Sequence, residues 1–223
     1  MPGIHPYAQW RVSKLKEFKI SEFHYITKIA NLQSIFNEEK ILSRNETLKK
    51  FNSDFTDWSD SEVQKRRDKE VVLTGNNRKK GHDVVPLFFN ANNPTLYVRK
   101  SEWQSLAVLS IDINTVTDKN IEIAFSKGNF SRDDSTQYHD LKKLNILDWK
   151  SINSSSSENI LPGDPRYENY KTNRSSEFFI YPYISTKWIR MIYVSDPLSE
   201  FKVSRVTNKG NTRVILNQKI FKE

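Results

Sequence analysis

The amino-acid sequence predicts an α+β fold in which strands dominate. Short runs of β-branched and aromatic residues are separated by turn residues along most of the chain, which is typical of β-strands. Hydrophobic residues make up 36% of the 223 positions and aromatic residues 12%, which is enough for a buried core. The length favours one domain over residues 1–223, with residues 1–20 as an N-terminal extension of unknown role.

The first predicted elements are a strand and a helix. The segment FHYIT, residues 23–27, has the apolar and aromatic composition of a strand. A helix is predicted from about Asn31, because this start would place Leu32, Ile35 and Phe36 on one face. The junction between the two elements follows directly after the strand.

A charged region and four predicted strands come next. Residues 45–80 are mostly polar, with a short predicted helix around residues 60–68 whose start offers Ser and Asp as candidate N-caps. Beyond it lie four apolar, β-branched or aromatic segments that are predicted to be strands. They are DVVPLFFN (83–90), TLYVRK (95–100), LAVLSIDI (106–113) and IEIAFS (121–126).

The last part of the chain combines a helix, a long loop and three strands. We predict a helix over about residues 134–144, a polar loop over residues 153–176 and a helical turn at residues 185–188. The loop contains the serine run Ser154 to Ser157, and loops of this length in compact domains are usually functional or disordered. The three strands are EFFIYPYI (177–184), WIRMIYVSD (188–196) and TRVILNQKIF (212–221).

The charge balance points to a negatively charged partner. Lys and Arg number 35 against 27 Asp and Glu, which gives a net charge of +8 and a pI near 9.4. Such an excess favours polyanions through counterion release. The start of the chain lacks the pattern of a secretory signal, and no stretch approaches the roughly 20 apolar residues of a membrane span. We therefore expect a soluble, cytoplasmic protein that does not contact a membrane.

Several classes of enzyme lack their usual sequence signals. The chain has no cysteine, which excludes disulfides, thiolate metal sites and a cysteine nucleophile. No histidine pair has the spacing of metal ligands, and neither a glycine-rich phosphate loop nor a nucleophile elbow is present. A metal-dependent nuclease, a kinase and a hydrolase are therefore disfavoured, and no metal is expected.

Four places in the chain carry candidate functional residues, and each has a structural alternative. The segment HYIT ends at a strand-to-helix junction, which can present amides and side chains to a ligand or be structural only. In SEVQKRRDKE, Arg66 and Arg67 could grip diphosphate oxygens or lie on a solvated helix face. Glu177 begins an apolar strand after the polar loop, where it could act on a ligand or point at water. His82 could orient a ligand or hold a loop by hydrogen bonds.

Taken together, these segments resemble the DarT family of bacterial DNA ADP-ribosyltransferase toxins. FHYITKIANLQSIFNEEKIL resembles the opening strand and helix of the family, and SEVQKRRDKE resembles its arginine segment. GHDVVPLFFNANNPTLYV resembles the strand and turn that follow, and SSEFFIYPYI resembles the strand that carries the catalytic glutamate. The segments keep the order of the family, and the match runs from about Phe23 to Asp196.

The resemblance implies an ADP-ribosyltransferase-like fold, with two packed β-sheets and peripheral helices around an NAD cleft. It implies NAD-dependent transfer of ADP-ribose to a base of single-stranded DNA, with NAD as co-substrate and no metal. It also implies that the chain is the toxin of a toxin–antitoxin pair, in which the antitoxin is a macrodomain protein that removes the modification.

The resemblance also assigns site residues by position. Arg67 and Glu177 would be catalytic. Residues 47–69 would form the NAD-binding element, and roughly residues 136–177 the region that reads the acceptor. The residues that would bind NAD are Tyr25, Ile26, Thr27, Ser34, Leu42 and Arg67.

Three positions depart from the family. Tyr25 stands where the family commonly has a histidine, Ser34 replaces a glycine, and Asn92 occupies a turn that commonly holds an arginine. His24 lies one residue out of register, and a strand alternates its faces, so His24 is not assumed to replace the missing histidine. The details of NAD binding and the identity of the acceptor base stay open.

The implied chemistry leaves two alternatives. Breaking the nicotinamide–ribose bond develops an oxocarbenium-like cation that a carboxylate such as Glu177 can stabilise. The acceptor base must be unstacked, which favours single-stranded nucleic acid. One alternative is an ADP-ribosyltransferase of the same fold that acts on RNA or protein, and the other is a non-enzymatic basic nucleic-acid-binding domain. Substitution of Glu177 by Ala would abolish the function of a transferase and spare that of a binding domain.

Overall fold

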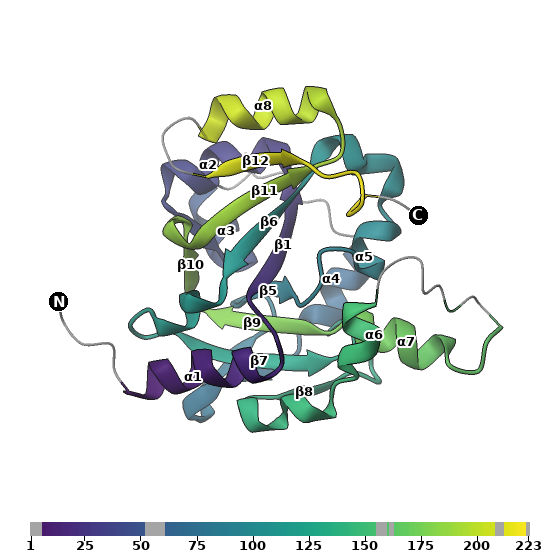
Figure 1. Cartoon of the computed structure of the whole chain (residues 1–223). Helices are drawn as coiled ribbons and strands as arrows, with labels where there is room; N and C mark the ends of the chain where they lie inside the picture. Colours follow the sequence, from purple (N-terminus) through teal and green to yellow (C-terminus); the bar gives the residue numbers. More distant parts are fainter. Residues whose placement is uncertain (1–5, 52–60, 155–159, 161–162, 208–211, 222–223) are drawn as a thin grey trace.

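The computed structural model describes residues 6–51, 61–154, 160, 163–207 and 212–221. Its centre is an eight-stranded sheet with the order β12-β11-β6-β1-β5-β9-β7-β8 (Figure 1). Neighbouring strands are antiparallel except β11 and β12, which are parallel. The strands are β1 (Glu22–Lys28), β5 (Val85–Phe88), β6 (Leu106–Asp112), β7 (Glu122–Lys127), β8 (Thr136–Tyr138), β9 (Glu177–Tyr181), β11 (Ile189–Val194) and β12 (Arg213–Leu216).

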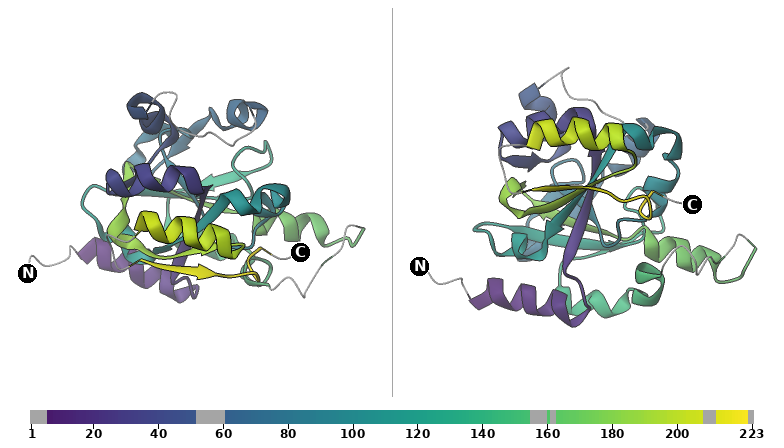
Figure 2. Two further views of the ribbon diagram at one scale, coloured as in Figure 1. Left: turned by 90° about the horizontal axis from the view of Figure 1, so that it is seen from above. Right: turned by 45° about the horizontal axis from the view of Figure 1, so that its top comes forward.

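The eight strands form two halves that meet at a narrow seam between β1 and β5. Among the described residues, His24 and Phe88 are the one pair that joins these two strands, whereas β1 pairs with β6 along its whole length. Strands β11, β6 and β1 run in a different direction from β9, β7 and β8 (Figures 1 and 2). The two packed sheets that the family resemblance implies are thus the two halves of one sheet.

Both halves contribute side chains to one hydrophobic core. β1 and β6 supply Phe23 and Leu109, and β5 and β9 supply Leu87 and Phe178. The rings of Phe23 and Phe178 stack across the seam with centroids 4.2 Å apart, and Phe89 packs edge-on against Phe178 at 5.9 Å. Because these rings are buried, their contact stabilises both halves together.

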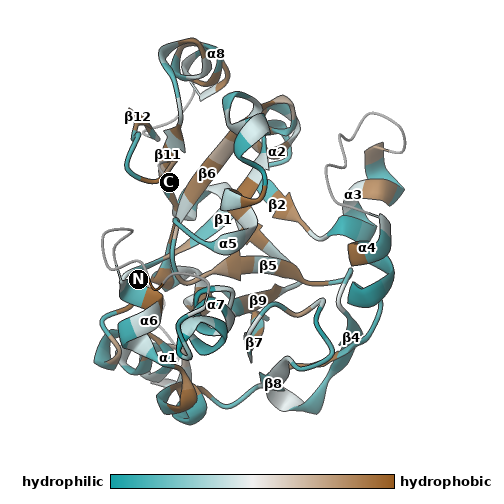
Figure 3. Cartoon of the chain, turned by 90° about the vertical axis from the view of Figure 1, so that its right-hand side faces the viewer, coloured by the Kyte–Doolittle hydropathy of each residue, from teal (hydrophilic) through white to brown (hydrophobic). Residues whose placement is uncertain are grey.

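Helices surround the sheet and carry most of the polar surface, while the strands are mainly apolar (Figure 3). Helix α8 (Pro197–Thr207) packs on β11, β12 and α2 (Leu32–Asn37). The remaining helices are α1 (Pro6–Glu17), α3 (Arg44–Phe51), α4 (Ser61–Arg67), α5 (Pro94–Tyr97), α6 (Trp149–Asn153) and α7 (Tyr167–Arg174). Two small sheets pair β2 (Lys40–Leu42) with β10 (Tyr183–Ser185), and β3 (Glu70–Val72) with β4 (Arg78–Lys80).

Most of the predicted elements are confirmed. The helix predicted from Asn31 is α2, in which Leu32 and Ile35 are buried, and the short charged helix is α4. The predicted helical turn is the 3-10 helix Thr186–Trp188, and the last predicted strand extends only to Leu216. The other confirmed strands, in chain order, are β1, β5, β6, β7, β9 with β10, and β11.

The segment TLYVRK, which was expected to be a strand, is helical. Pro94 begins α5, and the Asn93 side chain accepts a hydrogen bond from the Leu96 amide at 3.1 Å, which is the arrangement of an N-cap. A 3-10 helix, Lys100–Ser105, follows. The prediction is wrong because a short apolar run fits a strand and a helical turn equally well.

The prediction of a helix at residues 134–144 is also wrong. β8 pairs with β7 in this region, and Tyr138 stacks on Phe125 with centroids 5.4 Å apart. A 3-10 helix, Leu141–Ile146, follows, and its cap is Asp140, whose side chain accepts from the Lys142 amide at 2.9 Å. Pairing with β7 overrides the local helical tendency.

Several helices lie where the sequence predicted no regular element. α1 lies within the N-terminal extension, α3 within the polar region, and α7 within the predicted long loop. These helices are short or weakly amphipathic, so contacts with the rest of the fold determine where they form. Leu15 of α1 is fully buried in such contacts, and so is Val203 of α8, another helix that was not predicted. Most of the serine run and the candidate N-caps at residues 59 and 60 lie outside the described residues.

Candidate active site

Arg67 and Glu177, which are far apart in the sequence, form a buried ion pair. Arg67 Nη1 donates to Glu177 Oε1 at 3.0 Å and Nη2 donates to Oε2 at 2.9 Å, so the contact is bidentate. Oε1 also accepts the backbone N–H of Phe130 at 2.8 Å. The Glu177 side chain is 0% exposed and that of Arg67 is 12% exposed. A buried carboxylate requires such partners, and together they fix its position.

The sheet holds Glu177 from both sides. It is the first residue of β9, and it pairs with Phe88 of β5 and with Ser126 of β7. The next residue, Phe178, is buried in the core that joins the two halves. Glu177 therefore lies on a central strand, close to the seam, with little freedom to move.

The C-terminal end of α4 presents Arg67. The ring nitrogen Nε2 of His82 lies 2.9 Å from the Gln64 carbonyl oxygen, and the Gly81 amide donates to the Lys69 carbonyl at 2.9 Å. A Cβ atom on Gly81 would lie 2.3 Å from the Arg67 carbonyl oxygen, so only glycine fits there. Burial lowers the pKa of His82 below its ordinary value of 6.5, so this ring is neutral at pH 7.

Phe130 forms a wall beside the ion pair. The Arg67 Cζ atom lies 5.6 Å from the centroid of this ring, and Lys69 Nζ lies 4.7 Å from it. Burial lowers the pKa of Lys69, while Asp133 acts in the opposite direction. Since the Phe130 amide also binds Glu177, one residue orders both charged partners.

An open cleft of about 280 Å³ lies beside the pair. Apolar residues of its wall include Ile26, Val84 and Phe88, and the wall carries the guanidinium groups of Arg44 and Arg99 in addition to Arg67. Among the described lining residues, Glu177 is the one acid. A mixed apolar and basic wall suits a ligand that combines rings with phosphates.

The structure brings most of the predicted site residues to this cleft. Those that line it are Tyr25, Ile26, Leu42, Arg67 and Glu177. Ser34 lines a small adjoining cavity, which it shares with Tyr25 and Leu42. Thr27 is buried and does not line the cleft, and its hydroxyl accepts from Asn31 Nδ2 at 3.3 Å. The predicted set thus divides into a main cleft, a side cavity and one buried residue.

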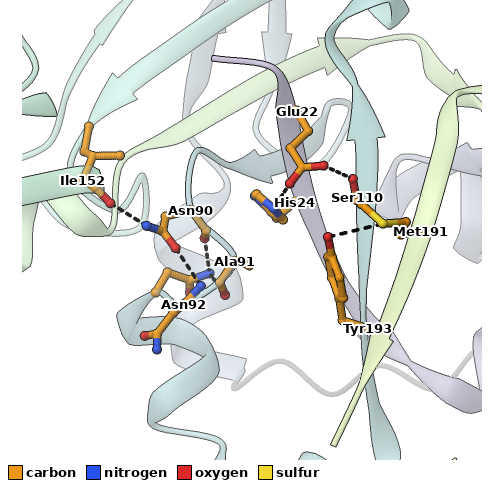
Figure 4. Close-up of polar contacts among 10 residues, drawn as sticks. Glu22, His24, Asn90, Ala91, Asn92, Ser110, Ile152, Met191 and Tyr193 are labelled. Atoms are coloured by element: carbon orange, nitrogen blue, oxygen red, sulfur yellow. Dashed lines mark hydrogen bonds and ion pairs between the residues drawn. The ribbon is translucent and has the colours of Figure 1, made fainter. Parts of the chain in front are cut away.

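His24 does not take the place that the family gives to a histidine. The residue is buried, and its Nε2 lies 3.3 Å from Glu22 Oε1, which belongs to a polar cluster with Ser110 (Figure 4). The hydrogen bond from His24 is the largest cause of a lowered pKa at Glu22. His24 is absent from the residues that line the cleft, whereas Tyr25 and Ile26, the next two residues of β1, both line it.

The turn around Asn92 receives an arginine from another element. The Asn92 amide donates to Asn90 Oδ1 at 2.8 Å within the turn (Figure 4). Arg174 of α7 donates through Nη2 to Asn92 Oδ1 at 3.0 Å and also to the Asn92 carbonyl. Its guanidinium lies 5.3 Å from the Tyr170 ring centroid and is buried. The loop region before Glu177 is thereby tied to the turn where the family commonly has an arginine.

Sequence reasoning missed several residues around the pair. Gly81, Phe130, Arg44 and Arg99 were not singled out, although all lie at the cleft or contact Arg67. Gly81 precedes His82 in a charged segment, and this glycine was the one local signal. Phe130 gave none, because its role depends on contacts with residues more than forty positions away.

The described part of the chain carries neither a cluster of metal ligands nor a membrane-spanning helix. No group of three or more His, Cys, Asp or Glu residues there could hold a metal ion. No described helix is long and apolar enough to cross a membrane.

Comparisons with known proteins match the family and the fold. The family model described as ssDNA thymidine ADP-ribosyltransferase, DarT, matches residues 24–221. Thermus sp. 2.9 DarT in complex with ADP-ribosylated ssDNA has a similar fold, with a TM-score of 0.76 and 20% identity over 91% of this chain and 96% of that chain. Thermus sp. 2.9 DarT in complex with NAD+ has a TM-score of 0.70 and 18% identity, over 91% and 98%.

Thermosipho africanus DarTG in complex with ADP-ribose is a further structural match, with a TM-score of 0.69 and 21% identity. The match covers 90% of this chain and 51% of that chain, so the present chain spans about half of it. A sequence comparison with curated proteins finds no match.

The fold and the family match together define an ADP-ribosyltransferase. The predicted fold class is therefore confirmed. The chain belongs to the DarT family of ssDNA thymidine ADP-ribosyltransferases. The predicted enzyme class and the predicted DNA substrate are confirmed by this membership.

Proposed function

We propose that this chain transfers ADP-ribose from NAD to thymidine in single-stranded DNA, with Glu177 and Arg67 as its catalytic pair. The observation that carries the proposal is the bidentate contact between these residues at the wall of the cleft. The family description supplies the acceptor that the sequence alone left open. Tyr25, Ile26, Leu42 and the more distant Ser34 and Thr27 form the surroundings in which NAD binds.

Glu177 acts on the ribose of NAD. The C1′–N1 bond breaks, nicotinamide leaves with the bonding pair as a neutral molecule, and positive charge develops on the ribose. A fixed carboxylate in a water-poor site stabilises that charge more than solvent does. Glu177 fits this role because it is buried, held by two partners and adjacent to the cleft.

Arg67 has a positioning role as well as a binding role. Its bidentate contact holds the carboxylate of Glu177 in one orientation, and its charge adds to that of Arg44 and Arg99 around the cleft. Three guanidinium groups in one wall suit the diphosphate of NAD. Because an arginine stays protonated, Arg67 does not itself accept the proton of the acceptor base.

The acceptor base supplies the nucleophile. In thymidine the ring nitrogen that is not bonded to deoxyribose carries a proton, and this proton passes to the Glu177 carboxylate as the nitrogen bonds to C1′ of the ribose. The base must be out of its stack for this nitrogen to reach the cleft, which favours a single strand. The exposed Arg66, next to Arg67 in α4, and the buried clamp of Arg174 on the turn at Asn92 support binding of the strand.

The biological setting is part of the same proposal. We place this chain as a cytoplasmic toxin that is paired with a macrodomain-type antitoxin. This chain matches about half of the Thermosipho africanus DarTG chain. That match supports the proposed pairing of a toxin with an antitoxin. Residues 1–223 form one domain in this proposal, because Val12 and Leu15 of the N-terminal extension pack in the same core as both halves of the sheet.

Substitution of the catalytic carboxylate tests the proposal. We expect Glu177→Gln to lower the rate of ADP-ribose transfer by about a thousandfold or more, because the amide carries no charge for the ribose cation. The matched control is Glu62→Gln, since Glu62 is an exposed glutamate on α4 that lies outside the cleft lining. Equal activity of the two variants would remove Glu177 from the mechanism.

The acceptor is tested with labelled NAD and matched oligonucleotides. We expect a mass gain of one ADP-ribose on single-stranded DNA that contains thymidine, and none on thymidine-free DNA, duplex DNA or RNA. A mass gain on RNA or on protein alone would favour the alternative transferases. Binding to DNA without any mass gain would favour a non-enzymatic binding domain.

A further inference from the structure

A second cavity of about 280 Å³ lies on the other side of the molecule from the catalytic cleft. It lies between α1, the turn at Thr74 and Gly75, and the segment at His139 and Asp140. The two cavities share no lining residue. Figure 3 shows α1 and α4 on opposite sides of the molecule, so this site is separate from the Arg67–Glu177 pair.

Arg11 is the central feature of this cavity. The residue is 7% exposed, and its hydrogen-bond partners are neutral: Nη1 donates to the Ile121 carbonyl at 2.7 Å and Nη2 donates to Thr74 Oγ1 at 3.2 Å. Nη1 also approaches the Val116 carbonyl at 3.4 Å. Among the described residues, no carboxylate forms an ion pair with Arg11, and its Nε has no hydrogen-bond partner. A buried cation without an anionic partner is costly, and an anion in the cavity would balance it.

Aromatic side chains stand beside this cation. The rings of Tyr7 and Trp10 stack with centroids 5.7 Å apart and 13° between their planes, and Arg11 Cζ lies 4.7 Å from the Tyr7 centroid. Tyr7 is 50% exposed, which is unusual for a large aromatic residue. Exposed rings next to a cation are the features that bind a nucleotide, because bases stack and phosphates pair with guanidinium groups.

The rim of the cavity sets the charge that the ligand can carry. His139 is exposed at the rim, and Lys142 and Lys143 follow it closely in the sequence. Asp140 also lines the cavity, but its carboxylate caps the following 3-10 helix by accepting from the Lys142 amide at 2.9 Å. One buried guanidinium beside one carboxylate matches a single phosphate group better than a diphosphate.

We propose that this cavity binds a nucleoside phosphate, with the phosphate at Arg11 and the base against the Tyr7–Trp10 pair. The ligand is either a free mononucleotide or one nucleotide of a longer strand. The proposal does not depend on the catalytic role of Glu177, because its site, its residues and its readout are all different from those of the cleft. α1 and its residues 7–11 also lie outside the segment that matches the family, residues 24–221.

Calorimetric titration of the full chain tests the proposal. The catalytic cleft is first saturated with carba-NAD+, the analogue bound in a Thermus sp. 2.9 DarT structure. Deoxyadenosine monophosphate and a thymidine-free oligonucleotide are then titrated separately. We expect saturable binding of one mononucleotide per chain. Added binding of the oligonucleotide would identify a strand as the source, and its absence would identify a free nucleotide.

Variants decide whether the binding occurs at this cavity. We expect Tyr7→Ala and Arg11→Gln each to weaken it on the order of tenfold, through loss of stacking and of the phosphate contact. The matched control is Phe201→Ala, because Phe201 is a 61% exposed ring with Arg205 Cζ 5.8 Å from its centroid, and it lines neither this cavity nor the catalytic cleft. His139→Ala and Tyr7→Ala carry the test if Arg11→Gln does not fold. No binding, or binding that Tyr7→Ala and His139→Ala leave unchanged, would overturn the proposal.

Discussion

At the scale of single residues, Glu177 combines a structural cost with a chemical task. Among the described residues, its buried charge is balanced by the guanidinium of Arg67 and by the amide of Phe130. A buried ion pair contributes little net stability, yet the loss of one partner leaves a charge without compensation. The residue that the proposed chemistry needs is therefore also one on which the fold depends.

Removal of Arg67 and then of Glu177 should affect stability and transfer activity differently. We expect Arg67→Met to lower the free energy of unfolding by about 3–5 kcal/mol, because Glu177 is then buried without its cation. The double variant Arg67→Met with Glu177→Leu should regain most of that loss, since no buried charge remains, while transfer activity stays absent. Urea denaturation and an ADP-ribose transfer assay measure the two effects. A double variant as unstable as Arg67→Met would show that the two residues are not coupled.

His82 should make the stability of the chain depend on pH. Burial lowers its pKa in the folded state from 6.5, so the unfolded chain binds the proton more readily. Its contribution is therefore complete above about pH 6.5 and is lost as the pH falls toward the lowered pKa. We expect His82→Asn to reduce the slope of unfolding free energy against pH between about pH 5 and 7. An unchanged slope in equilibrium unfolding would exclude His82 as its source.

At the scale of elements, the position of the short helix α4 depends on the chain segment that follows β4 and on Phe130, which follows β7. The Gly81 amide, the His82 ring and the Phe130 side chain contact the last turn of α4 or the residues just after it. A helix of this length is not stable by itself, so these contacts define where Arg67 points. The orientation of one catalytic residue is thus encoded outside its own helix.

Gly81→Ala should test that dependence. The added Cβ would lie 2.3 Å from the Arg67 carbonyl oxygen and 2.6 Å from Phe130 Cε1, so the end of α4 must move. We expect a loss of about 1–3 kcal/mol in unfolding free energy and a lower kcat. Gly75→Asn is the control, because Gly75 has open space around it and a φ of 83° that asparagine adopts. A fully active Gly81→Ala variant would contradict this account of α4.

The helices and strands also show which parts of the fold could be predicted from the sequence. Strands such as β6 and β7 could be predicted because their apolar runs are long and bounded by turn residues. The segment 95–100 was misjudged because Pro94 and the Asn93 cap convert a strand-like run into a helix. β8 was missed because its three residues become a strand only by pairing with β7. The local sequence pattern is therefore enough to predict the central strands. It fails where a single cap residue or a paired strand determines the secondary structure.

At the scale of the whole molecule, the site depends on contacts between distant segments. The resemblance to a family pointed to Arg67 and Glu177, and the structure places them in contact across 110 positions. Phe130 and Arg174 could not be predicted, because nothing near them in the sequence indicates which loop they will contact. The polarity of Ser34 and Thr27 likewise does not tell that Ser34 lines only the side cavity and that Thr27 is buried away from the cleft.

The shared core predicts that both halves of the sheet unfold together. We expect Phe178→Ala to lower the unfolding free energy by about 3–5 kcal/mol, because it removes the contact with Phe23 across the seam and the contact with Phe89. The transition should stay a single one when followed by fluorescence and by circular dichroism. The exposed Phe201→Ala is the control, with a change near zero. Two separate transitions would show that the halves fold independently.

The narrow seam also affects which side-chain substitutions β1 can tolerate where it lines the cleft. Beyond His24, β1 keeps its ladder with β6, but no further residue of its other edge pairs with β5 in the described chain. In an antiparallel strand every second residue turns its N–H and C=O groups toward that edge. Such main-chain groups survive any substitution except proline, so a change of side chain on this part of β1 leaves the donors and acceptors of its edge in place.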